Sequence, residues 1–405
     1  MAKIQTQKKF YFSQKNQNIC FQLSISYLFI IFISLFIKKI NTHIKHIQSI
    51  LYLDSQILLK INGTGNQEIL YYGYAYCPDF VYLNEEDNNI LNSDNCRIIY
   101  IDPEVNTEIN TVKLVWNSKV QNSLSMFQAL NNIIEVDLSG FNSSEVTDMS
   151  HMFQECYSIT SINFNNFDVS KVTSMECTFY NCFSLKELDL TSFNTPNLVE
   201  MRLLFFSCKN MISIDISSFD TSKVVNMEYL FYECFQLKNL KIRNFDTSKV
   251  EKMNFMFHEC RSLESLDLSM FNTSLVKDMS YMFSCLGLIT SLNLNNFDTS
   301  KVTNMTDLFQ GCRSLKYLNI SNFDTSEVQY MDYMFENCPK LEYLDLSNFH
   351  TPKLETMKEM FKGCESLISL DISNIDISQI NATSSLFQNC YKLLSLNLSS
   401  FNTVL

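Results

Sequence analysis

Glycine and proline are scarce in this 405-residue chain, with 7 and 5 copies, and tryptophan occurs once. Turns must therefore be made by Asn, Asp, Ser and Thr, whose short side chains hydrogen-bond to the neighbouring backbone. Because 46% of the residues are apolar, the composition excludes a disordered chain. A surplus of basic residues is also missing. The net charge of −12 would repel phosphate backbones, so we expect no nucleic-acid partner.

Sequence signatures of catalysis are missing as well. The chain has no glycine-rich phosphate loop, no G-x-S-x-G and no H-E-x-x-H. Its five histidines are not paired with a nucleophile and do not accompany the cysteines as ligands. We therefore expect that the protein is not an enzyme and has no catalytic residue, no metal site and no cofactor.

The start of the chain differs from the rest. Residues 1–47 hold seven lysines and no acidic residue, and 1–18 form a basic N-terminal segment. Residues 19–37, ICFQLSISYLFIIFISLFI, are nineteen positions without a charge, a length that just crosses a bilayer as a helix. An uncleaved transmembrane signal-anchor is the favoured interpretation, with a cleaved signal peptide and a buried soluble helix as alternatives. The first two indicate a membrane, cell-surface or extracellular location.

Most of the chain repeats itself every 26 residues. One phenylalanine keeps this step from Phe141 to Phe401, with Ile375 in its place once, and a second keeps it from Phe127 to Phe387. Methionine and cysteine follow the same period. Four ladders in one register predict a solenoid, in which each unit buries its apolar face only by stacking on its neighbours.

Each unit has two halves. In the first half, Leu188 and Leu190 flank Asp189, the alternation of a short strand. The second half places apolar residues at steps of three, three, one and three, which predicts a short helix. Those residues are Leu198, Met201, Leu204, Phe205 and Cys208. The predicted fold is therefore α/β, a leucine-rich-repeat-like solenoid with a parallel sheet on one face and short helices on the other, preceded by the N-terminal hydrophobic anchor helix.

The units divide the chain into regions. We expect a small β-rich region at residues 48–110 and the solenoid at residues 111–405. Its strands fall at 136–138, 162–164 and onward to 396–398, and a degenerate strand at 111–115 would cap the parallel sheet.

The repeat motif is L-x-x-L-D-L-S-x-F-[DN]-T-S-x-V-x-x-M-x-x-M-F-x-x-C, and residues 262–283, SLESLDLSMFNTSLVKDMSYMF, carry it closely. This motif resembles the BspA-like leucine-rich-repeat surface proteins, over about 270 residues. The resemblance implies surface display, adhesion or protein binding, without catalysis as a family trait.

The cysteines fall into two groups. Those on the 26-residue ladder have no zinc-ligand spacing, and we expect each to be a small buried group with a weak S–H donor. Cys285 is displaced by one position, and Leu286 takes its ladder site. Cys77 and Cys96 lie outside the ladder and are the candidate disulfide pair if the chain is exported.

One row of polar residues points outward from the expected sheet. Its charged members, the proposed binding face, are Asp137, Asp189, Asp215, Lys241, Asp267, Asp345 and Asp371. Neighbouring carboxylates repel, so this row is either a stripe for a cation or ligand or a solvated polar face. Glycosylation sequons at Asn319 and Asn397 fall on the same face. The favoured function is non-enzymatic binding of a protein or glycan at the cell surface; the alternative is an intracellular repeat scaffold for protein–protein interaction.

Overall fold

The computed structural model describes residues 55–84, 96–104, 108–378, 380, 383–399 and 401. The chain divides into two units, Met1–Leu53 and Asp54–Leu405, and all described residues belong to the second. The prediction of a membrane-spanning helix finds no counterpart in the structure. In the part of the chain that is described, no helix is long and apolar enough to cross a membrane. Residues 19–37 themselves lie outside the described residues.

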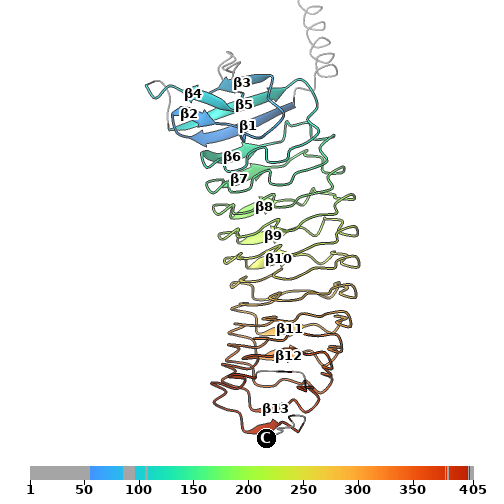
Figure 1. Ribbon diagram of the computed structural model, residues 1–405. Coiled ribbons are helices and arrows are strands. Elements are labelled where there is room, and N and C mark those ends of the chain that lie inside the picture. The colour runs from blue at the N-terminus through green and yellow to red at the C-terminus, as the bar shows by residue number, and fades with distance from the viewer. Residues whose placement is uncertain are drawn as a thin grey trace, which may run out of the picture. The chain divides into compact units, whose positions relative to one another are not determined.

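Antiparallel strands precede the repeats (Figure 1). They are β1 (Ser55–Asn62), β2 (Gly65–Glu68), β3 (Phe80–Leu83), β4 (Ile98–Ile101) and β5 (Ile109–Trp116). β5 pairs antiparallel with β1 and β3, and β2 pairs antiparallel with β4. The predicted strand at 111–115 is present within β5, but its expected place as the cap of the parallel sheet is wrong. β1 alternates buried and exposed residues and lies between β5 and β6, where it takes the sheet edge that the cap would have covered.

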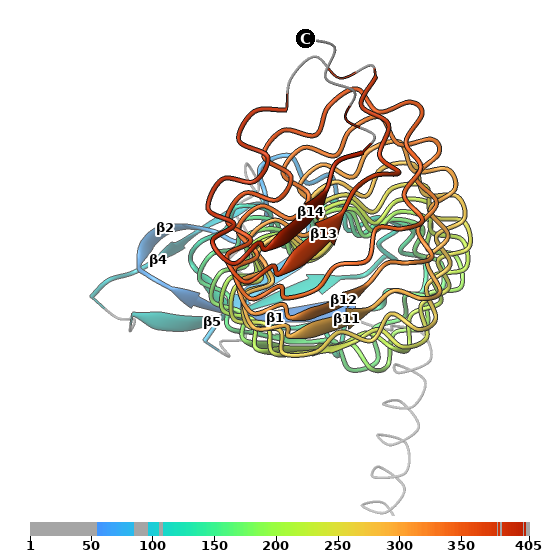
Figure 2. The ribbon, with the colours of Figure 1, turned by 90° about the horizontal axis from the view of Figure 1, so that it is seen from below.

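The repeats form coils whose short strands stack in parallel along one side (Figures 1 and 2). These strands are β6 (Ile133–Asp137), β7 (Ser161–Asn163), β8 (Glu187–Asp189), β9 (Ser213–Asp215), β10 (Asn239–Lys241), β11 (Ser291–Asn293), β12 (Tyr317–Asn319), β13 (Ser369–Asp371) and β14 (Ser395–Asn397). Partners are 26 residues apart, as in Leu188↔Ile214. The parallel pairing is confirmed, with strands about one residue earlier than predicted.

The predicted helices are absent from the described residues, so the α/β leucine-rich-repeat-like fold class is wrong and the fold is a β-solenoid. In the segment from Met253 to Cys260, backbone amides alternate between two kinds of partner. One set donates to carbonyls of the next coil: Phe255 to Ser280, Phe257 to Met282 and Glu259 to Ser284. The other set closes turns onto the third residue back: Met256 to Met253, His258 to Phe255 and Cys260 to Phe257. A helix would direct all of them within the segment.

This alternation needs left-handed backbone at two positions per coil, four residues apart. Tyr229 and Glu233, for example, have φ of 57° and 55°. Gly311 and Gly363 occupy the second of these positions in two coils, with φ of 70° and 75°. Elsewhere larger residues adopt this strained region. Helices about 10 Å wide fit behind strands about 4.8 Å apart only if the stack curves, whereas these turns bond directly to the next coil.

The predicted ladders fill the interior of the coils. Phe231 stacks on Phe205 with ring centroids 5.5 Å apart and on Phe257 at 5.9 Å. The ladder cysteines from Cys156 to Cys364 are buried beside this stack, and Cys234 Sγ donates to the carbonyl of Phe205 at 3.2 Å. Leu286 is fully buried where the cysteine ladder is interrupted. The prediction that the ladder cysteines are buried packing groups is confirmed.

Candidate binding face

The outward side chains of the solenoid strands form one surface, which we call the strand face. In β9, Ile214 points into the core, whereas Ser213 and Asp215 at either end of the strand point outward. The predicted binding residues Asp137, Asp189, Asp215, Lys241, Asp267, Asp345 and Asp371 all occupy the repeat position of Asp215. They therefore follow one another along this face.

All six of these aspartates also have a structural role that the sequence analysis missed. Asp189 Oδ1 accepts the backbone N–H of Thr191 at 3.0 Å, and Asp345 Oδ1 accepts that of Ser347 at the same distance. Equivalent bonds close the turn after the strand at Asp137, Asp215, Asp267 and Asp371. The spacing [DN]-x-[ST] after each strand was the available signal, because Asp and Asn form such turns.

Such bonds favour the ionised form of Asp189 and Asp215. The hydroxyl and amide of Thr191 lower the pKa of Asp189 below its ordinary value, even though the charge of Asp215 on the next strand opposes this. The pKa of Asp215 is lowered chiefly by the hydroxyl of Ser217. Asp189 and Asp215 therefore remain ionised side by side on neighbouring strands.

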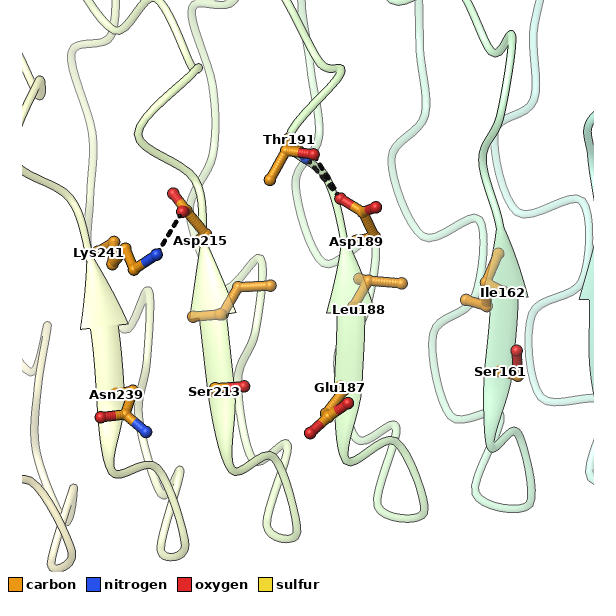
Figure 3. Close-up of a pocket in the computed structure, with 11 residues that line it drawn as sticks. Ser161, Ile162, Glu187, Leu188, Asp189, Thr191, Ser213, Asp215, Asn239 and Lys241 are labelled. Atoms are coloured by element: carbon orange, nitrogen blue, oxygen red, sulfur yellow. Dashed lines mark hydrogen bonds and ion pairs between the residues drawn. The ribbon is translucent and has the colours of Figure 1, made fainter.

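Neighbouring side chains relieve part of the repulsion. Lys241 Nζ lies 3.0 Å from Asp215 Oδ2 (Figure 3). Two amides do the same elsewhere: Asn163 donates to Asp137 at 3.0 Å and Asn397 to Asp371 at 3.1 Å. Because Lys241 is well exposed, its ion pair contributes little to stability.

Three shallow hollows lie along the strand face. The first, of about 350 Å³, is lined by β1, β6 and β7 and includes Lys60 and Asp137. The second, of about 560 Å³, crosses β7 to β10 and is lined by Glu187, Asp189 and the Asp215–Lys241 pair (Figure 3). The third, of about 450 Å³, lies over β11 and β12. Asp267 and Asp371 line none of these hollows, which therefore cover only part of the strand face.

The third hollow contains residues that the sequence analysis overlooked. Tyr317 and Tyr343 occupy the first outward position on neighbouring coils, and Asn293, Asn319 and Asp345 lie beside them. A tyrosine at a position otherwise held mostly by serine was the signal in the sequence.

The buried thiols are unsuited to ligation or nucleophilic chemistry. Burial raises the pKa of Cys156, Cys234 and Cys312 to about 12, so these thiols stay protonated at neutral pH. Within the described ranges, no group of three or more His, Cys, Asp or Glu residues is arranged to hold a metal ion.

Cys77 and Cys96, the candidate pair outside the ladder, form a disulfide with Cα atoms 5.6 Å apart. The bond joins the loop before β3 to the residues before β4. Next to it, Arg97 Nη2 donates to the carbonyl of Tyr74 at 2.6 Å. Both contacts tie the antiparallel region together.

The fold and the face define a parallel β-solenoid with 26-residue coils and a shallow polar surface on its strands. A family model described as "Mycoplasma protein of unknown function, DUF285" matches residues 102–214, 199–293 and 287–401. The chain belongs to this family. No curated protein matches it.

Proposed function

We propose that this protein is a non-enzymatic recognition protein of the cell surface or extracellular space, and that it binds a protein or glycan through the strand face. The observation that carries the proposal is the row of three hollows on one side of a regular stack. Repetition supports the proposal, because a ligand that is itself repetitive gains avidity from several equivalent contacts.

Pre-organisation of the face supports binding over a merely solvated surface. The turn bonds at Asp189 and Asp345 hold each carboxylate in one orientation before any ligand arrives. Less conformational entropy is then lost on binding. The net charge of −12 argues for ligands other than nucleic acid.

Two observations support an exported, surface-related role. The Cys77–Cys96 disulfide is typical of oxidising compartments and is rare in the cytosol. The repeat motif, as in SLESLDLSMFNTSLVKDMSYMF at residues 262–283, supports a finer relationship to the BspA-like surface proteins. Finding the two thiols reduced in protein isolated from its native cells would instead favour the intracellular scaffold.

The test blocks the strand face by introducing large, charged side chains. Arginine replaces Ser213, Ser291 and Ser369, which are outward residues of β9, β11 and β13. The matched control carries arginine at Ser222, Ser274 and Ser326, a turn position where Pro196 and Pro352 occur in other coils. Full-length chains are applied to an array of oligosaccharides, glycosaminoglycans and purified extracellular proteins. We expect binding by the native and control chains and its loss in the face-blocked chain; equal binding by all three would refute the proposal.

A further inference from the structure

The hollow over β11 and β12 differs from the other two in having aromatic side chains. Tyr317 and Tyr343 are 67% and 62% exposed, although each projects from the coil directly beside a buried leucine. Neither hydroxyl has a hydrogen-bond partner among the described residues. Two large rings therefore stand on the strand face without an intramolecular partner for their polar ends.

The faces of these rings are open. Elsewhere, aromatic residues at equivalent positions of neighbouring coils stack closely, as Tyr180 and Phe206 do at 4.5 Å. Within the described residues no ring contact joins Tyr317 to Tyr343. The equivalent positions on the coils to either side hold only Ser291 and Ser369. A flat apolar group thus has room to lie against either ring.

The polar groups around the rings are already oriented. Asn319 Oδ1 accepts the amide of Ser321 at 3.2 Å, and Asn293 Oδ1 accepts that of Asn295 at 3.2 Å. These bonds leave both Nδ2 groups without a partner among the described residues, so each is a free donor. Asp345 uses Oδ1 for the amide of Ser347, which leaves Oδ2 as a free acceptor. The hollow therefore offers two oriented amide donors, one carboxylate acceptor and two exposed tyrosine hydroxyls.

The negative charge of the hollow limits the class of ligand that it can bind. Asp345 is the only charged residue that lines this hollow, and no cation among its lining residues balances it. A sulfated or carboxylated glycan would therefore be repelled. Sugar hydroxyls both donate and accept hydrogen bonds, which fits mixed amide and carboxylate partners. The C–H face of a sugar ring suits the electron-rich face of an aromatic ring.

We propose that the hollow over β11 and β12 is a subsite for a neutral oligosaccharide. Tyr317 and Tyr343 stack on sugar rings, and Asn293, Asn319 and Asp345 bond to the hydroxyls at their edges. This assignment rests on the proposed function, because it names the ligand class of one part of the strand face.

The test is calorimetric titration of the full-length chain, produced in a host without N-glycosylation because Asn319 heads a sequon. The probes are cellotetraose, chitotetraose, maltotetraose and mannotetraose. We expect at least one to bind. Tyr317→Ala and Tyr343→Ala should each weaken that binding about tenfold, by loss of one stacking surface. Asn319→Asp keeps the turn acceptor but replaces the free donor with a charge, and should weaken binding without changing the melting temperature.

Tyr391→Ala is the matched control, because Tyr391 is 74% exposed but lies outside this hollow. It should leave the affinity unchanged. The subsite is refuted if no neutral tetrasaccharide binds, or if binding is the same in the Tyr317, Tyr343 and Asn319 variants. Face-dependent binding of proteins or glycosaminoglycans alone would refute the subsite and leave the proposed function standing. Binding that the face-blocked arginine chain retains would refute both.

Discussion

Cys260 donates its thiol hydrogen to the main-chain carbonyl of Phe231, 29 residues earlier on the adjacent coil, at a distance of 3.1 Å. The same bond recurs along the ladder, for example from Cys182 to Phe153 and from Cys338 to Phe309. A buried S–H donor thus bridges most neighbouring coils, with an interruption at Leu286.

The buried thiols make stability fall at alkaline pH. Burial raises the pKa of Cys156, Cys234 and Cys312 from 9.0 to about 12. Above pH 9 the unfolded thiols lose their protons while the folded ones keep them, so stability is complete below pH 9 and is lost as the pH rises towards 12. Each thiol contributes a slope of about 1.4 kcal/mol per pH unit.

Urea unfolding at several pH values from 7 to 10.5 measures this slope. A Cys156→Ala/Cys234→Ala double variant should show a shallower slope than the native chain. A Val225→Ala variant is the control, because it changes an exposed side chain and removes no thiol. A slope that does not depend on the number of ladder thiols would contradict the prediction.

The left-handed turns predict a stabilising glycine. Ala129 has φ of 60° and carries no polar side chain that benefits from this conformation. Ala129→Gly should therefore raise the free energy of unfolding by about 1 kcal/mol. Ala75→Gly is the comparison, because Ala75 is exposed and does not have positive φ. Chemical denaturation measures both, and a gain of the same size at Ala75 would count against the strain.

The phenylalanine stack predicts a large cavity effect. Phe231→Ala should lower the free energy of unfolding by about 3–5 kcal/mol, because Phe231 is fully buried between Phe205 and Phe257. The melting transition should also broaden, since coils are coupled mainly to their neighbours. Phe183→Ala, at a partly exposed ring, should cost much less. Equal melting curves for the two variants would be inconsistent with the stacked core.

The turn bonds of the strand face predict a difference between two substitutions at one site. Asp189→Asn keeps an oxygen for the Thr191 amide, whereas Asp189→Ala removes it and should cost about 0.5–1.5 kcal/mol. Protonation of Asp189 at acid pH should also lower the free energy of unfolding, as part of the effect of the alanine substitution does. The pKa of Asp189 is lowered on folding, so its contribution is present above the ordinary value of 3.8 and is lost as pH falls through the folded pKa. Unfolding measured from pH 6 to pH 2.5 tests this, and equal stability of the two variants at pH 6 would contradict it.

The sequence alone was sufficient to predict the 26-residue repeat, the pairing register of its strands and the residues of the core. Phe231 and Cys260 were assigned to the interior because residues 26 apart must stack, and Leu188 pairs with Ile214 as the alternation required. The outward row that includes Asp189 and Lys241 followed from the same alternation. A polar row alone did not reveal that Asp189 closes a turn, although its spacing to Thr191 carried that signal.

Only the tertiary structure decided between helix and turn in the second half of each coil. The apolar spacing of Met253, Met256, Phe257 and Cys260 suits both, because each puts these side chains on one side. The amide of Phe257 bonds to Met282 on the next coil, and this contact does not exist within an isolated repeat. The amides of Phe255 and Glu259 likewise bond to the next coil, and both residues adopt left-handed backbone, which a helix does not allow. The ring faces of Tyr317 and Tyr343 are open because the adjacent coils carry small residues at the equivalent positions. A single repeat does not determine this arrangement.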